Sequence, residues 1–427
     1  MPDISQESAR LLVRQDYKTL SLAALGGALE FYDFIIFVFF ATTIGALFFP
    51  PDMPDWMRLF QTFGIFAAGY VVRPIGGMVM AHFGDLLGRK KMFNLSILLM
   101  AVPTLLIGLL PTYASIGLAA PLLLLLLRVA QGAAVGGEVP GAWVFVSEHV
   151  PARHIGYACG TLTAGLTMGI LLGSMMATGI NSVFTPQQVL DYGWRLPFLL
   201  GGVFGLGAMY LRRWLHETPV FTELKQRKAL AAELPLKAVL REHRGAVVLS
   251  MLLTWMLSAA IVVVILMTPT LLQKVYGFDA RTALTANTAA TLCLAVGCVV
   301  AGVLADRLGA RRMLIGGALL LAACTYAFYT TVKVRPDLLL PLYCLLGFAV
   351  GVVGVVPSVM VRAFPAPVRF SGLSFSYNLA YAIFGGLTPV MVTLMLKVEP
   401  LAPAWYVMAL CAVGVVTALF VRDGQRQ

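Results

Sequence analysis

The stretch Gly84-Asp85-Leu86-Leu87-Gly88-Arg89-Lys90-Lys91 decides the fold, because it separates two long apolar runs by only a few residues. The runs, roughly 58–82 and 92–110, are each about as long as a helix that crosses a bilayer. Cations in so short a loop are retained on the cytoplasmic side of a membrane. A related stretch, Gly302-Val303-Leu304-Ala305-Asp306-Arg307-Leu308-Gly309-Ala310-Arg311-Arg312, follows a later apolar run. The pattern therefore predicts a duplicated membrane bundle.

The composition excludes a water-soluble domain. The 427 residues are 59% hydrophobic and only 12% charged, with a mean hydropathy of +0.86. Continuous apolar runs such as 246–272 favour helices over a β-barrel, whose strands alternate. The formal net charge of +11 does not predict a nucleic-acid partner, because basic residues in short loops are the usual topogenic signal.

Windows of about 20 apolar residues predict twelve spans. They are 20–49, 58–82, 92–111, 120–146, 155–180, 194–213, 246–272, 284–305, 313–332, 338–361, 370–396 and 403–421. Most of the 31 Lys and Arg residues fall in segments that one topology places inside the cell. We therefore expect a multi-pass monomer in the lipid bilayer of the cell inner (plasma) membrane, with both termini cytoplasmic.

The polar segment 214–245 is the predicted linker between two halves of six helices each. The expected organisation is a cytoplasmic N-terminal segment 1–19, a bundle 20–213, the linker 214–245, a bundle 246–421 and a cytoplasmic tail 422–427. Residues 1–19 are polar and charged, so no cleavable signal peptide is expected. The six cysteines show no CxxC spacing and the five histidines no HExxH spacing, so we expect no metal and no cofactor.

Several motifs carry a family resemblance. They are GDLLGRKK, RVAQGAAVGGEVPGA from Arg128, GWRLPFLLGG from Gly193 and HETPVF from His216. In this order they resemble the major facilitator superfamily, and specifically its metabolite:proton symporter family, whose members carry citrate, other di- and tricarboxylates, shikimate or zwitterionic osmolytes. The resemblance covers nearly the whole chain. It implies an all-α integral membrane fold of twelve transmembrane helices in two pseudo-symmetric six-helix bundles.

The chain departs from that family at Ala81, Leu86 and Arg362, where Gly, Arg and Glu are usual. The loops still predict a gate, because Asp85 could face the positive N-terminus of a neighbouring helix. The resemblance suggests that this neighbour is the eleventh helix. The gating residues that we expect are Asp85, Gly88, Arg89, Asp306 and Arg307. The alternative is that the loop cations serve membrane insertion alone, although aspartates contribute nothing to positive-inside sorting.

Acids inside the spans are candidates for proton coupling, because burying a charge costs several kcal/mol unless it is paired or hydrated. Glu30 and Asp33 lie three apart and share one face of the first helix. Two close carboxylates in a low dielectric bind protons more tightly than in water, as a reversible carrier must. Asp33, halfway through its run, is the first choice, followed by Glu30 and Glu138. A structural ion pair with an arginine on another helix is the alternative.

Arg73 and Arg128 are the only basic residues deep in the predicted spans. A guanidinium is always charged and offers paired donors that match a carboxylate. On the eleventh helix, four polar residues at i, i+3, i+4 and i+7 form one face. The expected substrate-binding residues are Arg128, Arg73, Gln131, Tyr32, Ser374, Tyr377, Asn378 and Tyr381. The alternatives are a structural role for Arg73, core packing for Tyr32 and interhelical hydrogen bonding for the polar face.

The predicted function is that of a secondary transporter, not an enzyme, which imports a small organic anion with protons by alternating access. The segment FSGLSFSYNLAYAIFGGLTP from Phe370 looks most like citrate-type carriers, which favours a di- or tricarboxylate. A symporter for shikimate or a zwitterionic osmolyte is the alternative within the family. A drug/proton antiporter is disfavoured because no proline occurs between 155 and 180, and a non-transporting membrane sensor because no sizeable soluble output domain is recognised.

Overall fold

The computed structural model describes the backbone of residues 11–87, 89–212 and 235–421. In this part of the chain the regular structure is entirely helical. Ten helices are long and apolar enough to cross a membrane, and two shorter apolar helices, Leu95–Leu109 and Arg195–Gly207, complete the predicted set of twelve. The predicted all-α class is confirmed.

The first half of the described chain supplies six spans. Its elements are α2 (Arg14–Phe39), α3 (Ala41–Phe48), α4 (Asp55–Leu87), α5 (Arg89–Leu109), α6 (Tyr113–Ile116), α7 (Ala119–His149), η1 (Ala152–His154), α8 (Ile155–Val183), α9 (Pro186–Gln188), η2 (Val189–Gly193) and α10 (Arg195–Arg212). The predicted span 20–49 is two helices, because the chain leaves helical geometry at Phe40.

The second half supplies the other six spans, several of them interrupted by π or 3-10 turns. Its elements are α12 (Pro235–Glu242), α13 (Arg244–Ala259), η3 (Ala260–Met267), α14 (Thr268–Lys274), α15 (Ala280–Leu308), α16 (Ala310–Thr331), η4 (Pro336–Leu338), α17 (Leu339–Val350), η5 (Gly351–Gly354), α18 (Val356–Ala363), η6 (Ala366–Val368), α19 (Arg369–Ala380), η7 (Tyr381–Gly385), α20 (Gly386–Leu396) and α21 (Ala402–Leu419). Most of the predicted linker 214–245 lies outside the described residues.

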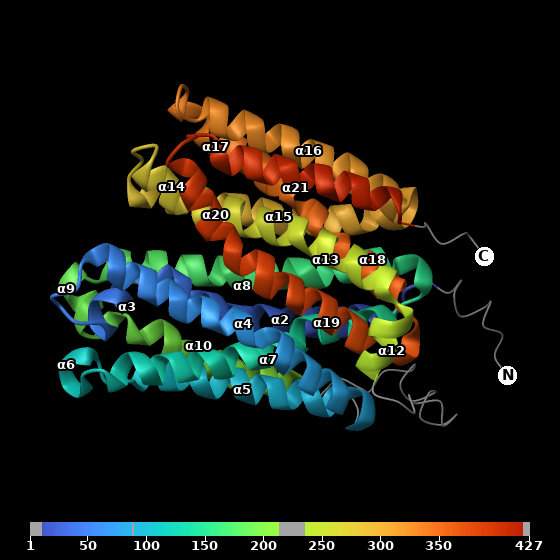
Figure 1. The fold of residues 1–427 in the computed structure, drawn as a ribbon, viewed down its shortest axis with the longest axis horizontal. Helices are drawn as coiled ribbons and strands as arrows, with labels where there is room; N and C mark the ends of the chain where they lie inside the picture. Colours follow the sequence, from blue (N-terminus) through green and yellow to red (C-terminus); the bar gives the residue numbers. More distant parts are fainter. Residues whose placement is uncertain (1–10, 88, 213–234, 422–427) are drawn as a thin grey trace.

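The helices run roughly side by side in two groups. In Figure 1 the blue-to-green helices of the first half lie below most of the yellow-to-red helices of the second, and α19 crosses in front of the lower group beside α4. The start of α2, the end of α21 and α12 lie at one end, which we name the α12 end; α3, α6, α9 and α14 lie at the other, the α14 end. Large apolar side chains such as Leu122, Leu126 and Leu319 are exposed on the outside, as a hydrocarbon environment requires.

The duplicated loop is as short as its sequence predicts. Only Gly309 separates α15 from α16, with φ of 96°, a left-handed conformation that glycine adopts without a steric penalty. In the first half, α4 ends at Leu87 and α5 begins at Arg89. Gly88 and the side chains of Asp85 and Arg89 lie outside the described residues, so the first-half gate keeps the status of a prediction.

Helix α15 begins at a side-chain cap. Asp279 is the N-cap residue, and its Oδ2 accepts a hydrogen bond from the Thr282 amide at 2.9 Å. The hydrogen bonds with Thr282 hold the pKa of Asp279 below its usual value. Helix α15, which carries Asp306, is therefore capped by Asp279 at its N-terminus and by Gly309 at its C-terminus.

Helices α4 and α7 cross at glycines, which lets their backbones touch. A Cβ on Gly132 would overlap the carbonyl oxygen of Gly69, and one on Gly136 would overlap that of Arg73. Small residues at such crossings are the main way in which membrane helices gain close packing. The crossing therefore sets how deep the Arg73 and Arg128 side chains sit between the helices.

We expect Gly132→Ala to destabilise the protein by about 1–3 kcal/mol, because the added methyl group has no space and must push α4 and α7 apart. The measurement is the unfolding midpoint of the purified protein in detergent. Gly64→Ala on α4 is the matched control, since a Cβ there meets no atom within 4 Å. Equal midpoints for the two variants would contradict the crossing.

Candidate functional site

The two arginines that the sequence places deep in the spans are buried side by side. Arg73 on α4 is 1% exposed and Arg128 on α7 is 0% exposed. Both lie against the ring of Phe34 on α2, whose centroid is 6.0 Å from the guanidinium carbon of Arg73 and 4.5 Å from that of Arg128. Both arginines thus lie in the interior, as predicted, and share one aromatic neighbour. We name Arg73 and Arg128 the arginine pair.

Aromatic rings from both halves surround Arg73. Its guanidinium carbon lies 5.3 Å from the ring centroid of Tyr70 on α4, 5.5 Å from that of Tyr377 on α19 and 4.8 Å from that of Tyr381 at the start of η7. The rings of Tyr70 and Tyr381 are stacked, with centroids 5.8 Å apart and planes within 9°. Trp143 of α7 meets Tyr377 edge-on at 5.0 Å. Cation–π attraction therefore ties the first half to the second at Arg73.

Arg128 is held mainly by neutral partners. Its Nη1 donates to Oε1 of Gln131 at 2.7 Å and to the carbonyl of Phe34 at 3.3 Å. Nε2 of Gln131 in turn donates to Oγ1 of Thr104 on α5 at 2.7 Å. Arg128 and Gln131, both expected to bind substrate, are thus bonded to each other, and the hydrogen bonds continue to a threonine on another helix. Thr104 was missed from the sequence, where nothing connects it to α7.

The arginine pair has donors to spare. In the described part of the chain, Nε and Nη2 of both Arg73 and Arg128 are buried without a hydrogen-bond partner, and neither side chain forms an ion pair with a carboxylate. A buried unsatisfied donor costs roughly 1–3 kcal/mol, and more when it is charged. An anion that reached the arginine pair would accept hydrogen bonds from the unpaired donors and would offset their positive charge. The arginine pair therefore has the chemistry of an anion-binding site.

Asp33 lies beside this cluster but faces another way. Its side chain is 0% exposed, and neither carboxylate oxygen has a hydrogen-bond partner. It points at Gly201 and Gly205 of α10, since a Cβ on Gly201 would overlap Oδ1 and one on Gly205 would lie 3.5 Å from Oδ2. The structural ion pair that the sequence left open for Asp33 is not formed within the described residues.

The other predicted acids and Tyr32 are placed as follows. Glu138 is buried on α7, 4% exposed. The Glu30 side chain lies outside the described residues. Tyr32 is buried between α2 and α10, and its hydroxyl donates to the carbonyl of Pro197 at 2.9 Å. That bond matches the core-packing alternative for Tyr32 more closely than a role in binding.

The polar face of the eleventh span divides into two parts. Nδ2 of Asn378 and Oγ of Ser374 both donate to the carbonyl of Gly136 on α7, at 2.5 and 3.3 Å. These two residues therefore make the interhelical hydrogen bonds that were the alternative to substrate binding. Tyr377 and Tyr381 instead contribute their rings to the cage around Arg73.

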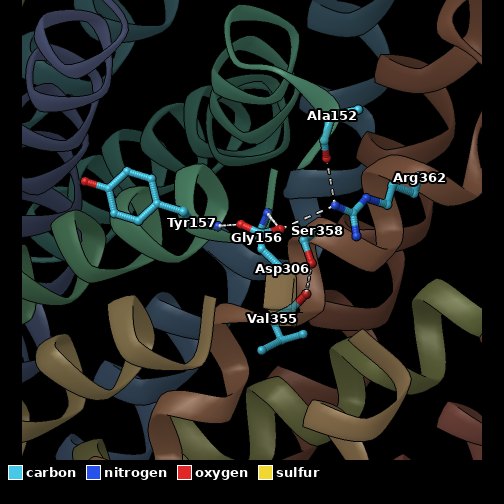
Figure 2. Close-up of polar contacts among 7 residues, drawn as sticks. All are labelled: Ala152, Gly156, Tyr157, Asp306, Val355, Ser358 and Arg362. Carbon is cyan, nitrogen blue, oxygen red and sulfur yellow. Dashed lines mark hydrogen bonds and ion pairs between the residues drawn. The ribbon is translucent and has the colours of Figure 1, made fainter. Parts of the chain in front are cut away.

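A second polar cluster joins the two halves at the α12 end, shown in Figure 2. Oδ1 of Asp306 accepts from the amide of Gly156 at 2.8 Å and Oδ2 from that of Tyr157 at 2.7 Å, so the carboxylate caps the first turn of α8. Nη2 of Arg362 on α18 lies 3.5 Å from Oδ1 of Asp306 and donates to the carbonyl of Ala152 at 3.1 Å. We name these contacts the Asp306 latch.

A partly buried ion pair reinforces the latch across the same end. Nη1 of Arg369, at the start of α19, lies 3.3 Å from Oε1 of Glu148, near the end of α7. Arg307, the other predicted gating residue of this loop, is exposed. The sequence did not identify Glu148, Arg362 or Arg369 as partners, because contacts between residues so far apart leave no spacing signal.

The described residues contain no group of three or more His, Cys, Asp or Glu that could hold a metal ion. Near the arginine pair, the side chains present can recognise an anion through guanidinium groups, make cation–π contacts with aromatic rings and bind a proton at a buried carboxyl.

Comparison with known sequences identifies the family. The model of the Major Facilitator Superfamily matches residues 23–389. The chain belongs to the major facilitator superfamily. It is a membrane transporter rather than an enzyme, and the predicted fold of two pseudo-symmetric six-helix bundles is confirmed.

The relatives include a citrate-proton symporter and a proline/betaine transporter. The chain is 33% identical to a citrate-proton symporter of Klebsiella pneumoniae over 87% of this chain and 84% of the relative. It is 29% identical to a proline/betaine transporter of Salmonella typhimurium over 95% of this chain and 83% of the relative. Among solved structures, the proton:xylose symporter XylE bound to 6-bromo-6-deoxy-D-glucose superposes with a TM-score of 0.80 at 18% identity, covering 96% of each chain.

For this major facilitator protein we expect Asp306→Ala to loosen the α12 end. Loss of both cap acceptors should cost about 1–2 kcal/mol, or roughly 5- to 30-fold in an opening equilibrium. The buried thiol of Cys159, two residues beyond Tyr157, reports the opening. The measurement is its rate of alkylation by N-ethylmaleimide, resolved by site with mass spectrometry.

The control is Asp337→Ala, which removes an exposed ion pair with Arg335 between α16 and α17, at the opposite end. Its Cys159 should react at the wild-type rate. If Asp306→Ala also reacted at that rate, the latch would not hold the end shut.

Proposed function

We propose that this protein imports a small organic anion, a di- or tricarboxylate such as citrate, together with one or more protons by alternating access. The observation that carries the proposal is the arginine pair: two buried guanidinium groups against one phenylalanine, without a carboxylate partner among the described residues. The citrate-proton symporter relative supports the same substrate class.

Electrostatics favours an anion with more than one carboxylate. Two guanidinium cations held against one ring repel each other, and an anion between them offsets that repulsion. A single carboxylate offsets one of the two cations, whereas a dicarboxylate can engage both with paired hydrogen bonds. The rings around Arg73 and the Gln131 contact of Arg128 hold the guanidinium planes while leaving Nε and Nη2 available.

We assign the proton to Asp33. An ionised carboxylate without a hydrogen-bond donor in an apolar interior pays a large desolvation cost, so a bound proton stabilises Asp33 where it lies. Cotransport then requires that Asp33 carries one proton whenever the anion occupies the arginine pair. The substrate-bound interior has a smaller net charge with this proton than without it when the two bundles move.

The topology and the assembly are also proposals. The clusters of Lys and Arg near the α12 end support a cytoplasmic position for that end, with the protein a monomer in the inner membrane. The halves 20–213 and 246–421 would move about the linker 214–245, and the Asp306 latch would close the cytoplasmic side. Because the loop is repeated in the two halves, we expect the matching gate of the first half to use Asp85, Gly88 and Arg89.

A zwitterionic osmolyte is the second candidate, favoured by the aromatic cage. The rings of Tyr70, Tyr377 and Tyr381, which face Arg73, are of the kind that attracts a quaternary ammonium. Betaine would use them if its carboxylate drew the Arg73 guanidinium away from the rings. The proline/betaine transporter relative supports this alternative. Proteoliposomes under an imposed acid gradient, given radiolabelled citrate, succinate, itaconate, shikimate or betaine in turn, separate the two.

We expect Asp33→Asn to abolish accumulation driven by a proton gradient while counterflow of the same labelled substrate continues. The amide keeps the shape of the neutral acid but cannot release a proton. Both measurements use the same proteoliposomes, so retained counterflow also demonstrates a folded protein. If the Asp33→Asn variant accumulated substrate at the wild-type level, the assignment of the coupled proton to Asp33 would be wrong.

We expect Arg128→Lys to raise the KM for citrate roughly 10- to 100-fold, because an ammonium cannot hold Gln131 and a carboxylate in one plane, a loss of about 1.5–3 kcal/mol. The measurement is the concentration dependence of counterflow.

Arg195→Lys is the matched control. Arg195 is a half-buried arginine whose Nη1 donates to the carbonyls of Gly108 and Leu110 at 2.9 and 2.8 Å, closing the end of α5. Its KM should match that of the wild type. A wild-type KM for Arg128→Lys would exclude Arg128 from binding.

A further inference from the structure

Helix α10 presents glycines where Asp33 lies. A Cβ on Gly201 would overlap Oδ1 of Asp33 and would lie 2.8 Å from Cγ2 of Thr104. A Cβ on Gly205 would overlap the Cβ of Ala101 and lie 3.5 Å from Oδ2 of Asp33. The carboxyl group therefore fills a space that exists because α10 has no side chains there, and the methyl group of Thr104 closes the same space from α5.

Among the described side chains, none that is charged donates a hydrogen bond into this space. Tyr32, on the same helix as Asp33, uses its hydroxyl on the carbonyl of Pro197. Arg128 of α7 is directed to Gln131 and to the carbonyl of Phe34. The hydroxyl of Thr104 is taken by the carbonyl of Met100 at 2.8 Å and by Gln131. Helices α5 and α10 carry charged residues only near their ends, and α8 meets α2 through glycines.

A buried space that offers no hydrogen-bond donor favours the neutral form of a carboxyl group over the ionised form. The ionised form accepts hydrogen bonds only and finds no donor, since both Asp33 oxygens are buried without a partner. The neutral acid pays only the smaller cost of one polar group in an apolar site. The ionised form must leave the space or admit water.

We propose that Gly201, Gly205 and the methyl group of Thr104 form a protonation pocket that accepts Asp33 only as the neutral acid. These residues act by positioning Asp33. One proton passes from water to the carboxylate when the side chain enters the pocket, and returns to water when it leaves; no other bond changes. The significance for transport rests on the function proposed above, whereas the pocket itself does not.

The test is an infrared titration of the purified protein in lipid, which follows the stretching band of protonated carboxyl groups. Asp33 is identified by the part of the band that Asp33→Asn removes. In Gly201→Ala the added methyl group takes the place of Oδ1, so we expect the midpoint of the Asp33 band to fall by at least about one pH unit, a tenfold loss in proton binding.

Gly207→Ala is the matched control on the same helix, because a Cβ at Gly207 meets no atom within 4 Å. Its band should titrate as in the wild type. Equal midpoints for Gly201→Ala and Gly207→Ala overturn the pocket.

Two threonine variants cover the case in which Gly201→Ala does not fold. Thr104→Ser removes only the methyl group and keeps the hydroxyl bonds, whereas Thr104→Val keeps a methyl group and loses the hydroxyl. The pocket predicts a lower midpoint for Thr104→Ser and an unchanged one for Thr104→Val. The reverse result overturns it. A wild-type protein that moves no test substrate contradicts the proposed function, while the infrared titration decides the pocket by itself.

Discussion

The cost of keeping charge in an apolar interior governs this structure. Arg73 and Arg128 place two guanidinium groups in this interior, so their surroundings must supply stabilisation. Aromatic faces, carbonyl oxygens and one glutamine provide it in place of carboxylates. Neutral partners hold a cation without neutralising it. The interior therefore keeps a positive potential, which an anionic solute can use and an ion-paired interior could not offer.

The arginine pair and the Asp306 latch are connected through the same helices. Helix α7 carries Arg128 in its middle and Glu148 near its end, and α19 carries Arg369 at its start and Tyr377 further along. The rings of Tyr377 and Tyr381 contact Arg73, so α19 meets the first half at two depths. A movement that separates α19 from α4 at one depth changes the contacts at the other. Under the proposed function, binding at the arginine pair and closure at the α12 end would therefore be coupled through these packed helices.

The sequence predicts the spans and the buried charges well, because both depend on local composition. Helix breaks such as the one at Phe40 were missed, since an apolar run looks the same whether or not its helix continues. The direction in which each side chain points was harder still to predict from the sequence. Asn378 and Tyr381 lie on one predicted face, yet one bonds to a backbone carbonyl and the other packs on an arginine. Which neighbour a side chain meets depends on how helices distant in sequence cross, and Gly201 beside Asp33 has no signature in either segment alone.

On α8, the carboxylate of the Asp306 latch accepts from main-chain amides rather than from side chains. Position 157 can therefore vary in size and polarity during evolution without loss of the contact, with proline as the exception because it has no amide hydrogen. Position 156 is more restricted, since any side chain there would press on the carboxylate. Alanine scanning would pass over Tyr157 as unimportant, and only a scan with imino acids would reveal that its backbone carries the closure.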